Sequence, residues 1–224
     1  MKTVKTNFIS KLFLFCALIF IPCFASADEQ TDGFFLFEAG ILSEGNFFSE
    51  ARKTILREKP EATKIKKEDS NAFLFRFAIN APYNLFNTRP GIAIDIGSTP
   101  SVSFYGKEYI WSSYYSAQTF GDGVVLRLML TNEYFAIGSA KTGKGLAVYT
   151  GVGGSLISEM QFGIYELEDA EDYGGISYEY GLKYYLRLDP GFSMTLGATK
   201  SAIIKSSDFS WETTQFLLGG AWRF

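Results

Sequence analysis

The stretch that decides the fold is Phe216-Leu-Leu-Gly-Gly-Ala-Trp-Arg-Phe224, which closes the chain. Its large residues recur at every second position, and in a β-strand alternate side chains share one face. That row consists of Phe216, Leu218, Gly220, Trp222 and Phe224. The opposite face is mostly small or charged, whereas soluble domains usually end in a loose polar tail. The alternation therefore favours a strand with lipid on its outer face and a polar barrel interior on its inner face.

The first 27 residues have the pattern of a cleaved signal peptide. Three lysines come before or at the start of an apolar run, Leu12 to Phe24, and an A-x-A cleavage site follows at residues 25–27. The run is shorter than the roughly 20 residues that a membrane-spanning helix needs. We expect export, which leaves one domain of residues 28–224. The alternative is a lipoprotein signal at Cys23, but Ile21-Pro22 stands where small residues are expected.

Eight segments of the remaining chain, the final stretch included, have the pattern of strands; most alternate as the final stretch does, while the fifth is Gly-rich and less regular. Aromatic residues make up 17% of the chain, and signals for helix ends are nearly absent, which favours an all-β fold. We expect strands near residues 35–41, 73–79, 92–96, 124–131, 146–165, 178–188, 192–198 and 211–224. The predicted fold is a closed antiparallel up-and-down transmembrane β-barrel of eight strands. Residues 109–118 and 134–140 are further candidate strands, so ten strands remain the alternative.

The connections alternate between long and short. The charged segment 42–71, the aromatic segment 105–121 and the acidic segment 166–175 are long, whereas residues 189–191 form a tight turn. If both termini are periplasmic, the long connections are extracellular, as in outer-membrane barrels. In the loop 42–71 we expect a short helix over residues 50–58, capped by Ser49 and stopped before Pro60. This loop is either a solvated surface segment or a contact site for a host surface, lipopolysaccharide phosphates or another protein.

The predicted inner face carries charges on most strands. The expected lumen charge network consists of Glu38, Arg76, Asp95, Arg127, Glu179, Lys183, Arg187 and Arg223. An eight-stranded barrel is just wide enough for side chains to fill it, so opposite charges would pair and seal the interior. The alternative is a narrow pore that prefers anions, because basic residues outnumber acidic ones in this set.

Several kinds of chemistry lack the residues that they need. The chain has no histidine, and both of its cysteines lie in the predicted signal peptide, which excludes His-dependent and thiol catalysis and the common zinc sites. The segment Gly138–Gly145 nearly matches a P-loop, but Gly145 replaces the required Ser or Thr and a strand follows it. The acidic residues 166–172 suit loose Ca²⁺ binding but lack EF-hand spacing. We expect no catalysis, cofactor, structural metal or nucleic-acid partner.

Taken together, the signal peptide, the alternating strands, the Gly-rich segment Val148–Gly154 and the final Trp222-Arg223-Phe224 resemble the small outer-membrane β-barrel family of Gram-negative bacteria, of the OmpA-like transmembrane-domain type. This resemblance implies an outer-membrane location and contacts with membrane lipid and lipopolysaccharide. It also implies that the terminal row ending at Phe224 is read by the barrel-assembly machinery. Barrel enzymes of this membrane use a histidine, so a structural or surface-interaction role is expected. The alternatives are a porin-like small channel and a soluble periplasmic lipocalin-like binder, whose large apolar residues would lie inside.

Overall fold

The computed structural model describes residues 33–69, 72–81, 85–110, 112–121, 123–158, 172–206 and 209–224. The predicted signal peptide and most of the acidic connection 166–175 lie outside these residues. Within the described ranges, no helix is long and apolar enough to cross a membrane.

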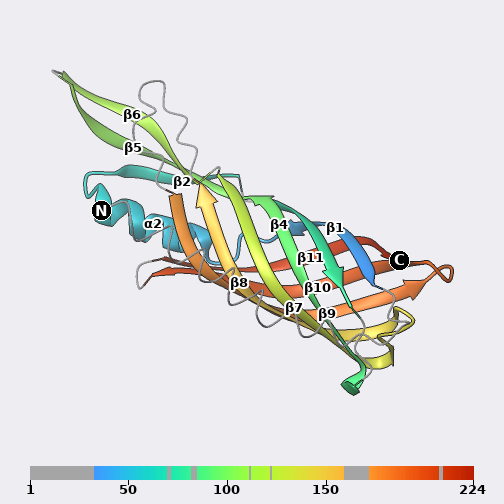
Figure 1. Ribbon diagram of the computed structural model, residues 1–224. Helices are drawn as coiled ribbons and strands as arrows, with labels where there is room; N and C mark the ends of the chain where they lie inside the picture. The colour runs from blue at the N-terminus through green and yellow to red at the C-terminus, as the bar shows by residue number, and fades with distance from the viewer. Residues whose placement is uncertain are drawn as a thin grey trace.

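Eight antiparallel strands close into a barrel (Figure 1). They are β1 (Phe34–Leu42), β3 (Ala72–Asn80), β4 (Thr88–Ser98), β7 (Val124–Ser139), β8 (Lys144–Ser158), β9 (Asp172–Arg187), β10 (Phe192–Ser206) and β11 (Phe209–Arg223). Each strand pairs with the barrel strands that precede and follow it in the chain, and β1 closes the ring against β11. The predicted up-and-down barrel and its eight strands are confirmed.

Side chains alternate between an apolar outer wall and a buried interior. In β3, every second residue from Phe73 to Ile79 is exposed, while Arg76 and its alternate neighbours are buried. Similar outward rows of exposed large apolar residues run along the other barrel strands. A soluble protein rarely exposes an apolar patch of such extent. The arrangement is apolar outside and polar inside, as in barrels that span a membrane.

Aromatic rings lie side by side on the outer wall where β1 meets β3. Phe37 stands directly opposite Phe77, with ring centroids 5.1 Å apart, and stacks on Phe75 at 6.3 Å. Cross-strand aromatic pairs of this kind stabilise neighbouring strands. The lipid-facing residues therefore also help to fix the register of the barrel.

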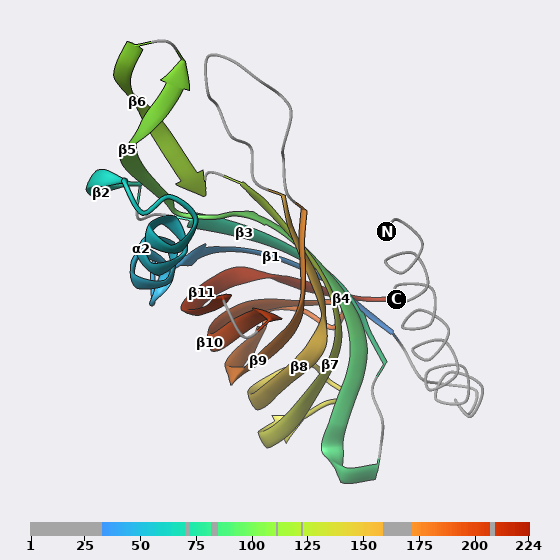
Figure 2. The ribbon, with the colours of Figure 1, turned by 90° about the vertical axis from the view of Figure 1, so that its left-hand side faces the viewer.

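A second, smaller sheet and a helix stand at one end of the barrel. The sheet has the order β2 (Thr63–Asp69), β5 (Ser101–Ile110) and β6 (Ser112–Gly121), and the helix is α2 (Phe47–Glu58). Figure 2 shows that β5 and β6 project away from the barrel while α2 lies beside the ends of β1 and β11. We call these four elements the cap. The ten-strand alternative is wrong, because residues 109–118 belong to the cap and residues 134–139 continue β7.

The helix α2 begins earlier than predicted, and Ser49 is not its N-cap. Asn46 precedes the first helical residue, and Ser49 lies inside the helix, where its hydroxyl donates to the Asn46 carbonyl at 2.9 Å. The side chain of Asn46 is occupied elsewhere, since it donates to the carbonyl of Ser210 and accepts from the backbone NH of Glu212. The cap is thereby tied to β11, and this tie fixes where the helix starts.

The opposite end of the barrel carries the start of β1, the end of β11 and the short turns between strands. Phe34 of β1 pairs with Arg223 of β11 at this end. The turn between β7 and β8 places Gly138 and Gly145 at φ values of +96° and +126°, which favour glycine. Strand β8 follows this turn directly, so the segment that resembled a P-loop precedes no helix.

Candidate functional site

The centre of the interior is built around Arg76. Its Nε and Nη2 atoms donate to the two Asp95 oxygens at 2.7 and 2.8 Å. Its Nη1 and Nη2 atoms also donate to the two Glu179 oxygens at 3.1 and 2.5 Å. Both contacts are bidentate, the geometry for which a guanidinium is best suited. One arginine on β3 thus connects β4 with β9 across the barrel.

Arg127 on β7 extends this centre towards β10 and β11. Its Nη2 lies 2.6 Å from Asp95 Oδ2 and 3.7 Å from Glu179 Oε2. Its Nη1 donates to the Ser201 hydroxyl. With the amide of Gln215 turned over, its oxygen accepts from Arg127 at 3.0 Å and from Ser201 at 3.1 Å. Neutral polar side chains therefore complete the shell around the second guanidinium.

A second group of charges lies closer to the termini. Lys183 Nζ lies 2.7 Å from Glu38 Oε2 and 3.6 Å from Glu133 Oε1. Glu133 also accepts from the Tyr185 hydroxyl at 2.5 Å and lies 3.6 Å from Arg89. Because Arg76 is 4.0 Å from Glu38, the two groups form one continuous network.

We call this network the interior charge cluster. Its eight charged members are all fully or almost fully buried: Glu38, Arg76, Arg89, Asp95, Arg127, Glu133, Glu179 and Lys183. Among the described residues, it contains four cations and four anions. Within this cluster the charges balance, so the excess of basic residues in the expected network comes from Arg187 and Arg223, which are not part of it.

The structure brings six of the eight residues of the expected network together. Arg187 is instead half-buried near the end of β9, where its Nε donates to the carbonyl of Asp189 at 3.0 Å. Arg223 is half-buried at the end of β11, opposite Phe34. Both residues have the predicted position on the inner side of the alternation, but they lie at the rim of the barrel.

Sequence reasoning missed Arg89 and Glu133, which face each other across β4 and β7. Arg89 lies before the expected strand 92–96, and Glu133 lies beyond the end of the expected strand 124–131. Both residues continue the two-residue period of the inward side chains of their strands. Extending the expected strand 124–131 by one period reaches Glu133, and extending the expected strand 92–96 towards its start by two periods reaches Arg89.

Aromatic rings surround several of the buried cations. The Arg89 guanidinium lies 3.9 Å from the ring centroid of Phe34 and 4.8 Å from that of Phe135. Lys183 lies 4.3 Å from the ring centroid of Tyr149. Cation–π contacts of this kind strengthen when they are desolvated. The rings also occupy space that would otherwise be open beside the charges.

Apolar side chains pack against the interior charge cluster towards both ends of the barrel. Along β7, the inward residues change from Met129 to Arg127 to Val125, that is, from apolar to charged to apolar. The layer towards the cap includes Phe47 and Trp211, whose rings meet edge to face at 5.4 Å. The layer towards the termini is packed around Phe34, Leu36, Met129, Phe135 and Tyr185. Towards the cap the described interior becomes apolar, whereas towards the termini Arg89 and Glu133 lie among the apolar side chains, against Phe34, Phe135 and Tyr185.

The terminal row lies on the outer wall as the alternation predicts. Phe216, Leu218, Trp222 and Phe224 are 60%, 56%, 44% and 69% exposed. Gly220 is covered by the rings of Phe192 and Trp222, and a Cβ there would lie 2.6 Å from Phe192. The backbone NH of Phe224 donates to the carbonyl of Gly33 at 3.0 Å, so the end of the chain is tied to the start of β1.

No candidate metal site is found among the described residues. They contain no group of three or more carboxylates that is placed to hold a metal ion. Each carboxylate of the interior charge cluster lies within 4.0 Å of a buried cation, the pairing expected of buried charges. The predicted acidic Ca²⁺ ligands at 166–171 lie outside the described residues.

The strand order, the apolar outer wall and the charged interior together define the class of protein. The chain has the architecture of the small eight-stranded outer-membrane β-barrels, as the sequence resemblance implied.

Comparisons with known proteins say less about the class of this protein than its own geometry does. No family model matches the chain, and no curated protein matches it. The solved structure of Ail, the attachment invasion locus protein of Yersinia pestis, in complex with the heparin analogue sucrose octasulfate is 13% identical. It covers 86% of this chain and 99% of its own, with a TM-score of 0.45.

Two Pseudomonas aeruginosa barrels are similar at the same level. The N-terminal β-barrel domain of OprF is 14% identical over 87% of this chain and 100% of its own, with a TM-score of 0.42. OprG is 12% identical over 87% of this chain and 97% of its own, with a TM-score of 0.39. Because these scores are below 0.5, the assignment of class rests on the geometry of this chain itself.

Proposed function

We propose that the protein is an integral outer-membrane barrel with a closed interior that holds the cap at the cell surface. The observation that carries this proposal is the interior charge cluster, in which four buried cations and four buried anions compensate one another and are packed against apolar side chains. A filled interior leaves the membrane anchor and the cap as the functional parts. The predicted signal peptide supports export to this membrane.

A conducting pore fits these residues less well. Ion pathways are lined by charges that remain accessible to solvent. Here the side chains of Arg76, Asp95 and Glu179 are 0% exposed and bound to one another. Apolar side chains that include Trp211 of β11 and Phe47 of the cap lie between these charges and the surface at that end of the barrel.

A soluble lipocalin-like binder is also disfavoured. Such a barrel would place its large apolar side chains inside, around a ligand cavity. In this chain the large outward residues include Leu196 and Phe216, each 60% exposed, and Ile41, 62% exposed. The centre of the interior is instead occupied by ion pairs.

The cap is the part that we propose meets external partners. The outer face of α2 and the strand β2 expose several basic side chains, namely Arg52, Lys53, Arg57, Lys64, Lys66 and Lys67. Some are already engaged, since Lys67 lies 2.7 Å from Glu44 and Lys53 lies 2.7 Å from Glu50. The mixed charge favours polar, specific contacts with a surface component over non-specific adhesion. Lipopolysaccharide and host surface molecules are the proposed partners.

The closed interior predicts a clear result in planar lipid bilayers. We expect the refolded mature barrel to insert and add no steady conductance, because paired charges and apolar layers fill the lumen. Insertion is checked on the same samples by a heat-sensitive gel shift and by flotation with vesicles. A reproducible steady conductance that scales with the amount of folded protein would favour the pore instead.

The terminal row predicts an assembly defect. In cells, Phe224→Asp is expected to deplete the folded barrel from the outer-membrane fraction, because the exposed ring at the end of β11 is the proposed signal for the assembly machinery. Phe86→Asp is the matched control, since Phe86 is 73% exposed at the same end of the barrel but lies outside the terminal row. Equal depletion by both variants, or by neither, would contradict this role. Refolding of purified Phe224→Asp into detergent separates assembly from stability.

A further inference from the structure

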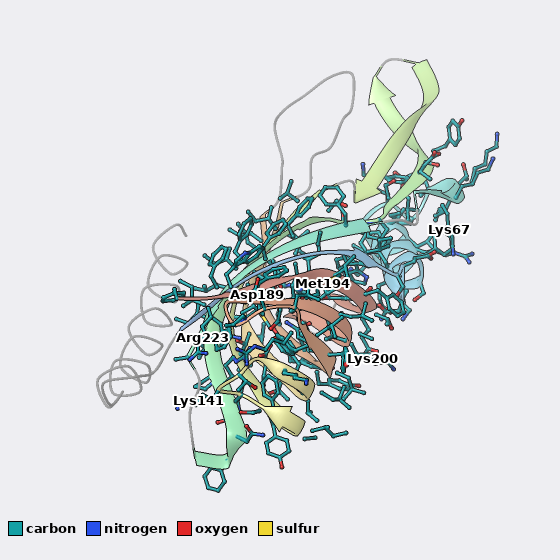
Figure 3. The ribbon with its side chains drawn as sticks, turned by 90° about the vertical axis from the view of Figure 1, so that its right-hand side faces the viewer. Lys67, Lys141, Asp189, Met194, Lys200 and Arg223 are labelled. Carbon is teal, nitrogen blue, oxygen red and sulfur yellow. The ribbon has the colours of Figure 1, made fainter. Side chains whose placement is uncertain are left out.

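A pocket of about 250 Å³ interrupts the apolar outer wall where β9, β10 and β11 approach the cap. Two rows of outward-facing residues cross it in register. In the first row, Lys200 of β10 stands between Tyr180 and Thr214. In the second, Ala202 stands between Tyr178 and Glu212. Figure 3 shows Lys200 towards the end of the barrel that carries Lys67, away from Asp189 and Arg223.

Lys200 is charged, whereas the outward-facing residues that precede it in its strand are apolar. The preceding outward residues of β10 include Met194 and Leu196, which are apolar and exposed by 39% and 60%. A cation on the lipid-facing side of a barrel is costly at the bilayer midplane and tolerated near the head groups. The neighbouring Tyr178 and Tyr180 are residues of the kind that concentrates at that level. The pocket therefore lies at head-group depth if the outer wall is in lipid.

The pocket holds one charge of each sign, and neither is engaged within the described residues. The Nζ of Lys200 and the carboxylate of Glu212 make no ion pair or hydrogen bond there. Ala202 lies between them and is 2% exposed although it faces outward, so a small side chain forms the floor of the hollow. The backbone of Glu212 is fixed, because Asn46 accepts its NH at 2.7 Å.

We propose that this pocket binds a zwitterionic head group with a phosphate and a primary ammonium, namely phosphoethanolamine carried by a membrane lipid. The inference rests on the proposed membrane location. The two rows lie about 6.6 Å apart along the strands, two residues at roughly 3.3 Å each. Lys200 and the Thr214 hydroxyl face the phosphate, while Glu212 and the ring of Tyr178 face the ammonium. Each ionic group of the ligand thus meets a side chain of opposite charge.

The test uses the refolded mature protein in a neutral detergent and counts retained lipids by native mass spectrometry. Phosphatidyl-ethanolamine, -choline and -glycerol with identical acyl chains are compared. We expect one ethanolamine lipid to be retained about tenfold more strongly than the glycerol lipid, since charge-assisted contacts are the strong ones. Soluble phosphoethanolamine competes if the head group is the recognised part, and it fails to compete if only acyl chains are bound.

Variants separate the two halves of the pocket. Lys200→Gln is expected to weaken retention of all three lipids, whereas Glu212→Gln removes the preference for ethanolamine over glycerol. Ala202→Phe fills the hollow without changing a charge and should abolish retention. Lys141→Gln, an exposed lysine at the opposite rim, is the matched control and should behave like the wild type.

Two outcomes would overturn the inference: equal retention of the three lipids by the wild type, or unchanged preference in both Glu212→Gln and Ala202→Phe. The heat-sensitive gel shift shows for each variant that the barrel is folded. Insertion into vesicles is measured separately. A protein that inserts without preferring the ethanolamine lipid refutes only this site, whereas one that fails to insert refutes the proposed membrane function.

Discussion

Replacing Arg76 by methionine is expected to lower the free energy of unfolding by about 3–5 kcal/mol, the usual cost of removing one partner from a buried ion pair. Arg76 makes four hydrogen bonds to Asp95 and Glu179, and all three side chains are buried. Without the guanidinium, the interior charge cluster keeps one negative charge too many. Urea unfolding in lipid vesicles, followed by tryptophan fluorescence, measures the loss.

Three further variants make this prediction specific. Arg76→Lys keeps the charge but loses the bidentate geometry, so an intermediate loss is expected. Arg76→Met combined with Asp95→Leu removes a compensating pair and should recover much of the stability, because apolar replacements of buried pairs are often well tolerated. Arg187→Met, at the rim, should change stability little. If Arg76→Met is no more harmful than Arg187→Met, the cluster does not hold the interior together.

The second large effect is expected from Trp211→Ala. Trp211 is fully buried, meets Phe47 of α2 edge to face, and donates from its indole NH to the carbonyl of Glu44 at 3.1 Å. Truncation of a buried tryptophan to alanine costs about 3–5 kcal/mol. The contacts that are lost are those that hold α2 against the barrel. The helix should therefore detach from the barrel while the outer wall stays intact.

Limited trypsin digestion measures this detachment. Cleavage after the exposed Arg52 and Lys53 is expected to accelerate roughly a hundredfold or more, since about 1.4 kcal/mol corresponds to a factor of ten. Trp222→Ala removes an equally large ring from the outer wall and should leave cleavage in α2 unchanged. Equal acceleration in the two variants would mean that Trp211 does not anchor the cap.

The two-residue period of the sequence predicted the barrel well because the bilayer selects for it. Every barrel strand has to present apolar side chains outward, so rows such as Phe73 to Ile79 can be recognised without tertiary information. The same period indicates on which face a residue lies but not its depth in the barrel. Arg187 and Arg223 were therefore assigned to the correct face and the wrong depth.

Depth is set by the register between strands. The register places Glu38 opposite Arg76, Arg76 opposite Asp95, and Asp95 opposite Arg127, so charges alternate in sign along one level of the wall. This order depends on the lengths of β1, β3, β4 and β7 and of their connections. The sequence indicates those lengths only approximately.

The helix of the cap was predicted from the sequence, but its docking on the barrel could not be, for a different reason. Phe47, Ala51 and Ile55 follow a helical spacing that is visible in the sequence. Their partner Trp211 lies in the last strand, and only the closed barrel brings it beside α2. The start of the helix likewise depends on Asn46, whose side chain contacts β11.

The central claim is that the apolar wall faces lipid while the interior is closed to it. Quenching by brominated lipids tests this claim with two of the chain's own tryptophans. Trp111 is replaced by phenylalanine in both variants. In the first variant Trp211 is replaced as well, so that only Trp222 on the outer wall remains. In the second variant Trp222 is replaced instead, so that only Trp211 in the interior remains. In vesicles, strong quenching of Trp222 and little quenching of Trp211 is the predicted result. Weak quenching of Trp222, or equal quenching of the two, would contradict the account.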